Sequence, residues 1–103
     1  ALSGSEARHP LGMSDVTPIG SDTDYATDVK RGLEFMPLIK AGHAASLIEL
    51  AIRYVISNPA LPTTEIGIAT LDELQQATAA VNKGPLSPDA LAQIKQVQAG
   101  FVI

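Results

Sequence analysis

The sequence contains no cysteine among its 103 residues, and this absence excludes several kinds of chemistry. Without thiols the chain cannot form disulfides, use a cysteine nucleophile or bind zinc through sulfur. A cysteine-free chain also fits a cytoplasmic location, where disulfides are rare. The two histidines, His9 and His43, are far apart in the sequence and lack the spacing of metal ligands. We therefore predict no metal site.

Basic residues, tryptophan and long apolar runs are also scarce. The 7 basic residues are outnumbered by 11 acidic ones and form no cluster, so the formal charge is −4. Such a chain is a poor candidate for binding nucleic acid or an anionic membrane surface. No apolar run approaches the roughly 18 residues that suggest a membrane span. Because 46% of the residues are apolar but few are aromatic, we predict a folded, mainly aliphatic core.

Common signatures of catalysis and phosphate binding are missing as well. The sequence has no GxGxxG, GxxxxGK[ST] or GxSxG motif. The acidic residues Asp22, Asp24 and Asp28 lack the glycine and terminal glutamate of a calcium loop, and we interpret them as solvated acids at a helix start. We predict no catalytic residue in the chain.

The first 22 residues are rich in glycine, serine, proline and aspartate and show no periodic pattern. They are predicted to form a loop, which is either a functional lid or a disordered tail. Apolar residues then recur at helical spacing, and Pro37 is expected to interrupt or restart this helix. The next helix, predicted over residues 44–57, is apolar around most of its circumference and needs partners on more than one side. Its thin polar stripe includes Glu49 and Arg53, which are correctly ordered for an i,i+4 pair.

The second half of the chain predicts a strand followed by two helices. Residues 64–69 are predicted to form a short strand, and Thr70 with Glu73 forms a capping-box pattern for a helix over 71–82. A last helix over 88–99 is predicted to begin at a proline in its first position. A single strand cannot satisfy its own backbone groups. The chain therefore has the pattern of an excerpt from a larger fold, and we expect it to associate with itself or with the missing part.

Three stretches in order resemble the closing segment of the aldo-keto reductases: residues 46–59, 65–74 and 83–88. Residues 1–4 resemble the turn after the seventh strand of that family, and 5–42 are the least specific part. The resemblance implies a (β/α)₈ barrel, for which ~250 residues is typical. The fold expected for this chain is mostly α with one short β-strand, as the C-terminal fragment of such a barrel.

The resemblance assigns each segment of the chain a place in the barrel. The implied elements are the loop after strand seven (1–22), helices (23–58), strand eight (64–69), helix eight (71–82) and the terminal helix (88–99). The family's catalytic Asp, Tyr, Lys and His lie on earlier strands, and none of them maps onto this chain. The chain alone is therefore predicted to be inactive.

The resemblance also implies part of a cofactor site, because the family binds the adenosine end of NADP at the strand-eight loop and the following helix. The matching positions, with those near the pyrophosphate, are Leu2, Ser3, Gly4, Gly67, Ile68, Ala69, Thr70, Glu73 and Gln76.

Two positions depart from the family pattern. Ala69 stands where an arginine often faces the 2′-phosphate of NADP, and Glu73 stands at a second basic position. A carboxylate would repel a 2′-phosphate but accept a hydrogen bond from a 2′-hydroxyl, so we predict NAD rather than NADP as cofactor. The other interpretation is that Glu73 only closes its capping box.

Two functions follow as hypotheses. The first is a fragment of an oxidoreductase that transfers hydride between a nicotinamide nucleotide and a small carbonyl or alcohol. The second is an independent helical protein-interaction module, favoured by the apolar helix over 44–57 and the apolar C-terminal tail. Both predict exposed apolar surface and self-association.

Overall fold

The computed structural model describes residues 25–101, which are mostly helical, as predicted. The helices are α1 (Tyr25–Leu33), α2 (Met36–Lys40), α3 (Leu47–Ile56), α4 (Leu71–Asn82) and α5 (Pro88–Ala99). The bounds of α4 and α5 agree with the sequence prediction. The loop predicted over 1–22 lies outside the described residues.

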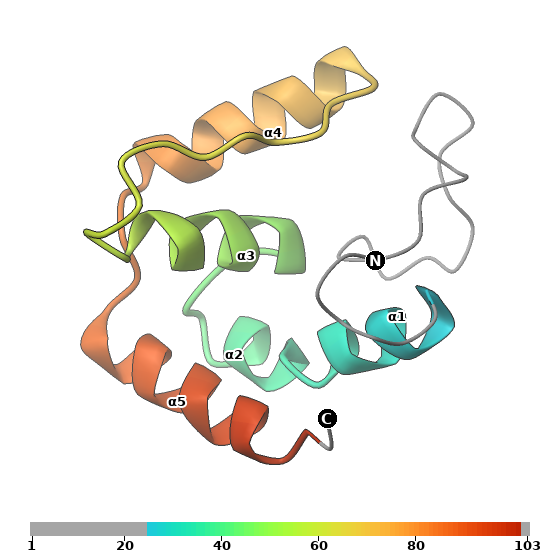
Figure 1. Cartoon of the computed structure of the whole chain (residues 1–103), viewed down its shortest axis with the longest axis vertical. Helices are drawn as coiled ribbons and strands as arrows, with labels where there is room; N and C mark the ends of the chain where they lie inside the picture. The colour runs from blue at the N-terminus through green and yellow to red at the C-terminus, as the bar shows by residue number, and fades with distance from the viewer. Residues whose placement is uncertain (1–24, 102–103) are drawn as a thin grey trace.

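Helix α3 is the central element of the fold. Figure 1 shows it between α4 on one side and α2 and α5 on the other, which confirms that it needs more than one partner. It begins at Leu47, later than predicted, because Ser46 has extended backbone angles and its hydroxyl accepts a hydrogen bond from the Glu49 N–H (3.1 Å). A serine in this position caps the first turn of a helix.

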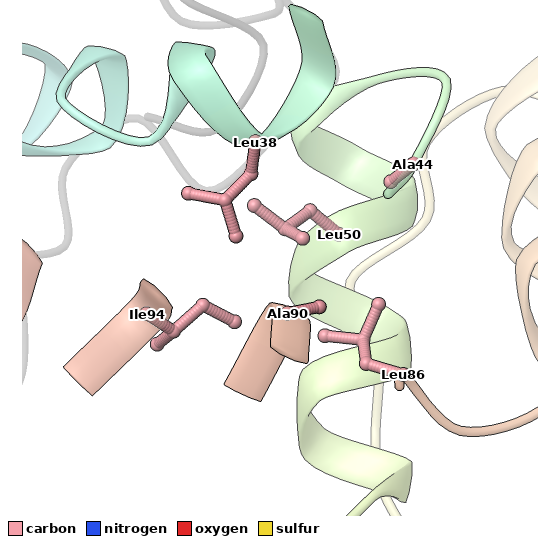
Figure 2. Close-up of a cluster of buried hydrophobic side chains, with 6 residues drawn as sticks. All are labelled: Leu38, Ala44, Leu50, Leu86, Ala90 and Ile94. Carbon is pink, nitrogen blue, oxygen red and sulfur yellow. The ribbon is translucent and has the colours of Figure 1, made fainter. Parts of the chain in front are cut away.

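The core is small and aliphatic, as predicted. Figure 2 shows side chains from α2, α3 and the α5 region pointing toward one another. The cluster consists of Leu38, Ala44, Leu50, Leu86, Ala90 and Ile94. Burial of apolar side chains is the main stabilising contribution in such a cluster, and Leu38, only 1% exposed, lies at its α2 side.

Local signals set the ends of several helices. Pro37 lies in the first turn of α2, so the chain restarts a helix there rather than continuing α1. Gly42 and Gly84 follow α2 and α4 with φ angles of 87° and 80°, a left-handed conformation that glycine adopts without a steric penalty. Ser87 caps α5 by accepting a hydrogen bond from the Ala90 N–H (3.2 Å).

The strand predicted over 64–69 is absent from the described structure. These residues are neither helix nor strand, and that prediction was wrong for the described part of the chain. The physical reason is the lack of a neighbour, since residues 25–101 contain no second strand that could form a ladder. The segment instead runs alongside α4 (Figure 1).

The start of the apolar tail packs against the end of α1. The ring of Phe101 meets that of Phe35 edge to face, with centroids 5.8 Å apart, and the Arg31 guanidinium lies 5.9 Å from the Phe101 ring centroid. Aromatic and cation–π contacts of this geometry are favourable. They fix the C-terminal end of α5 against the α1–α2 turn.

Candidate functional site

The predicted capping box forms at the start of α4. The Thr70 hydroxyl accepts a hydrogen bond from the Glu73 N–H (3.2 Å), and Glu73 Oε2 accepts one from the Ala69 N–H (2.8 Å). The reciprocal bond thus reaches the residue before the N-cap rather than the N-cap itself. The interpretation of Glu73 as a capping residue is confirmed.

The remaining positions predicted for the cofactor lie around this helix start. Gly67 and Ile68 immediately precede it and are exposed, whereas Ala69 and Thr70 are half-buried. One turn further along α4, Gln76 is exposed and donates a hydrogen bond to Asp72 Oδ2 (2.6 Å). The structure therefore brings six of the predicted positions to one end of α4. Leu2, Ser3 and Gly4 lie outside the described residues.

The electrostatics of this helix start are acidic. Asp72 and Glu73 lie in the first turn of α4, and the sequence has no Lys, Arg or His between Arg53 and Lys83. Residues 54–82 therefore supply no basic side chain to neutralise a phosphate monoester. A carboxylate has about four acceptor sites, so Glu73 retains acceptor capacity for a hydroxyl after binding the Ala69 N–H.

A shallow hollow of about 360 Å³ separates the segment before α4 from the helix itself. Its wall on the segment side is formed by Thr64, Ile66 and Ile68, and its helix side includes Leu74, Ala77, Thr78 and Val81. The three residues of the segment alternate, as side chains on one face of an extended chain do. The four residues of α4 have the i, i+3, i+4, i+7 spacing of one helix face. The segment therefore covers α4 with one face, as a strand would, although its backbone is not hydrogen-bonded to another strand.

The backbone of this segment has unused hydrogen-bonding capacity. Within the described part of the chain, no backbone hydrogen bond involves residues 62–68. The side chains of Ile66 and Ile68 are 38% and 45% exposed, and Leu71 at the start of α4 is 69% exposed. Unpaired extended backbone beside exposed apolar side chains is the signature of an edge that another strand can cover.

A second polar cluster lies inside the fold, and only one of its contacts was predicted. Glu49 and Arg53 form the expected i,i+4 pair at 3.2 Å, but Glu49 is buried and also accepts a hydrogen bond from Lys83. The Arg53 guanidinium donates further hydrogen bonds to the backbone carbonyls of Gly84 (2.9 Å), His43 and Pro85 (both 3.2 Å). This Arg53 cluster ties α3 to both the α2–α3 loop and the α4–α5 connection.

The signal for this cluster was present in the sequence. Ser46 and Glu49 have the same capping-box spacing as Thr70 and Glu73, and Glu49 Oε2 accepts a hydrogen bond from the Ala45 N–H (3.1 Å). The same cap at Thr70 leaves Glu73 half-buried, so the spacing predicts the capping bond but not the burial of Glu49. His43 is half-buried, and its Nε2 lies 3.0 Å from the Gln93 amide nitrogen.

Glu49 should make the stability of the fold sensitive to acid. Burial raises the pKa of Glu49, but hydrogen bonds from Lys83, the Ala45 N–H and Arg53 lower it more, and the pKa lies below its ordinary value of 4.5. A lowered folded-state pKa contributes stability above the unfolded-state value, and this contribution is lost as the pH falls through the folded-state pKa. We expect Glu49→Gln to cost about 2 kcal/mol at pH 7 and to flatten the fall in stability below about pH 4.5.

Urea unfolding of both proteins from pH 7 to pH 3 measures this effect. Glu34→Gln is the control, because Glu34 is exposed on the turn between α1 and α2. Its stability curve should run parallel to that of the unaltered chain. Equal acid sensitivity of the Glu49→Gln variant and the unaltered chain would contradict the assignment.

An open apolar pocket of about 200 Å³ lies where α2, α3 and α5 meet. Its lining residues are Phe35, Leu47, Leu50, Ala51, Tyr54, Ile94 and Gln98. It holds no titratable or nucleophilic group suited to catalysis apart from the Tyr54 hydroxyl.

The described residues contain no group of His, Asp and Glu side chains that could hold a metal ion. In the same residues, no helix has the length and apolar character needed to cross a membrane.

No protein-family model matches the chain, and neither a curated protein nor a solved structure matches it significantly.

Proposed function

We propose that this chain is the C-terminal part of a cytoplasmic NAD(P)-dependent oxidoreductase of the aldo-keto reductase type, in which it supplies the adenosine end of the cofactor site. The whole protein would be a (β/α)₈ barrel that transfers hydride between the nicotinamide and a small carbonyl or alcohol. The catalytic groups would come from the barrel strands that precede this chain.

The observation that carries the proposal is the unpaired segment before α4. Thr64, Ile66 and Ile68 cover α4 with the alternation of a strand, yet no backbone hydrogen bond involves residues 62–68 in the described part of the chain. In a (β/α)₈ barrel, a strand followed directly by a helix has a parallel neighbour on each edge. Two such neighbours would satisfy the backbone groups that this segment leaves unpaired.

The helix start after this segment supports a nucleotide as ligand. In barrels of this class, ligands bind at the C-terminal ends of the strands, where the following loops and helix starts lie. Gly67, Ile68 and Thr70 occupy this end of the segment, and Glu73 and Gln76 are on the first turns of α4. An adenosine presents hydroxyl and ring groups that such a polar, accessible end can bind.

The acidic first turn of α4 favours NAD over NADP. Asp72 and Glu73 would repel the 2′-phosphate of NADP, whereas the free acceptor sites of Glu73 suit a 2′-hydroxyl. The capping bond to the Ala69 N–H does not compete with this role, because it uses one oxygen of the carboxylate. It would instead hold the carboxylate in a fixed position for the ribose.

Steady-state kinetics of the natural protein that contains this chain test the proposal. We expect carbonyl reduction with a higher kcat/KM for NADH than for NADPH, and no turnover by the 103-residue chain alone. Glu73→Arg should shift the ratio toward NADPH by about tenfold or more, since one favourable charge interaction of ~1.4 kcal/mol corresponds to tenfold.

Glu73→Gln is the matched control, because its amide oxygen can still accept the Ala69 N–H while the charge is lost. It should shift the ratio less than Glu73→Arg. A strong NADPH preference of the unaltered protein would refute the NAD assignment. Absence of any nicotinamide-dependent turnover would refute the oxidoreductase proposal, and turnover by the isolated chain would refute the placement of the catalytic groups.

The competing proposal is an independent helical interaction module. The exposed apolar side chains of Leu61, Leu71, Leu74 and Val81 favour it, because large exposed apolar patches mark interaction surfaces. A natural protein that consists of this chain alone and lacks nicotinamide-dependent activity would favour the module. A natural protein with six or so further strand–helix units before it would exclude the module.

A further inference from the structure

The segment over 63–69 has two backbone edges, and they are not equivalent. Because Thr64, Ile66 and Ile68 face the hollow beside α4, the segment is extended, and successive residues direct their N–H and C=O groups to opposite edges. Even-numbered residues form one edge and odd-numbered residues form the other.

The odd edge is partly used within the chain. The Ala69 N–H donates to Glu73 Oε2 at 2.8 Å, so the last donor of that edge is occupied by the α4 cap. The even edge, formed by Thr64, Ile66 and Ile68, makes no backbone hydrogen bond among the described residues. Pro62, which has no N–H, precedes this edge, and the N-cap Thr70 follows it. Residues 64, 66 and 68 are therefore the residues of the even edge that can pair with another strand.

We infer that the even edge binds a second copy of this chain, antiparallel and centred on Ile66. In this register Ile66 lies opposite Ile66 of the second copy, and Thr64 lies opposite Ile68 of the second copy. Residues 64, 66 and 68 of both copies then form roughly six hydrogen bonds across the two-fold axis. The interface is isologous, so it closes at a dimer.

The charges favour this register over a parallel one. Glu65 is the only charged residue of the segment, and no basic residue lies between Arg53 and Lys83. A parallel, in-register pair would place Glu65 opposite Glu65 of the second copy, and like charges directly opposite are destabilising. The antiparallel register places Glu65 opposite Gly67 instead.

The apolar surface favours the same partner. Ile66 and Ile68 are 38% and 45% exposed in one copy. In the antiparallel pair these side chains from both copies lie on one face of a two-stranded ribbon, between the two α4 helices. Cross-strand pairs of β-branched residues stabilise such ribbons. This inference concerns the 103-residue chain and does not rest on the proposed function. In the proposed barrel a neighbouring strand would occupy the same edge, so the dimer is expected only for the chain without that strand.

Single cysteines test the register directly, because the chain has no cysteine of its own. The variants are Thr64→Cys, Ile66→Cys and Ile68→Cys, each purified as the full chain and oxidised under mild conditions. In the inferred dimer the two 66 positions are about 5.5 Å apart between Cα atoms, within the range of a disulfide. The two 64 positions, like the two 68 positions, are about 14 Å apart, beyond that range.

We expect Ile66→Cys to cross-link at least about tenfold faster than either other variant alone. A mixture of Thr64→Cys and Ile68→Cys should cross-link as a heterodimer. Sedimentation of the unaltered chain should show a monomer–dimer equilibrium.

Equal cross-linking of all three variants would indicate parallel pairing and overturn the inference. A dimer that Ile66→Cys does not cross-link, or a monomer at every attainable concentration, would also overturn it. None of these outcomes bears on the oxidoreductase proposal, which the kinetics of the natural protein decide.

Discussion

Replacing Arg53 by methionine is expected to lower the free energy of unfolding by about 3 kcal/mol. Methionine fills a similar volume but cannot donate hydrogen bonds. The substitution would leave the carbonyls of Gly84, His43 and Pro85 without their donor, and the buried carboxylate of Glu49 with one cation fewer. Breaking a buried ion pair from one side is costly because the remaining charge stays desolvated.

The loss is large relative to the stability of a domain of this size, since native domains are stable by only about 5–15 kcal/mol. Urea unfolding at pH 7 measures it, with both proteins at one concentration because association alters apparent stability. Lys95→Met is the matched control, because Lys95 is exposed on α5, and it should change stability by less than about 0.5 kcal/mol. A similar small change for Arg53→Met would mean that the Arg53 cluster does not stabilise the fold.

The helices could be predicted from the sequence where their ends are coded locally. The cap Thr70 with Glu73 and the sequence Ser87-Pro88 mark the starts of α4 and α5, and Gly84 marks the end of α4. Each signal acts within about one turn of the chain. The start of α3 was predicted too early, because the apolar pattern continues into Ala44 and Ala45, although Ser46 is the N-cap and the helix begins at Leu47.

The strand prediction failed because a strand, unlike a helix end, depends on residues that are distant in the sequence. The pattern of residues 64–69 suits a strand, but a strand exists only through hydrogen bonds to a neighbour. No such neighbour exists in residues 25–101. Local sequence therefore indicated the extended conformation and the face that covers α4, and it could not supply the partner.

The contacts of the Arg53 cluster could likewise be predicted only where they are local in the sequence. The i,i+4 spacing predicted the contact between Glu49 and Arg53, but the carbonyls of Gly84 and Pro85 are about thirty residues away. Contacts of that separation depend on how α3 packs against the α4–α5 connection. The capping-box spacing of Ser46 and Glu49 indicates the bond to the Ala45 N–H, but not the burial of the carboxylate.

The predicted cofactor residues fall into two groups, those joined by local contacts and those that are distant in the sequence. Ala69, Thr70 and Glu73 are joined by the α4 cap, which local sequence encodes. Leu2, Ser3 and Gly4 are distant in sequence and lie outside the described residues. Their approach to the α4 start remains a prediction, because it depends on the rest of a barrel.

Amide hydrogen exchange over residues 63–68, resolved residue by residue in the natural protein that contains this chain, tests the central proposal most directly. A strand with a neighbour on each edge has its odd and even amides bonded alike, whereas a self-paired chain bonds only its even amides. We predict that Glu65, Ile66 and Gly67 all exchange roughly a hundredfold or more slowly than an unpaired coil. Exchange of the odd-numbered amides at the rate of an unpaired coil would contradict the account of this segment as an inner strand of a barrel.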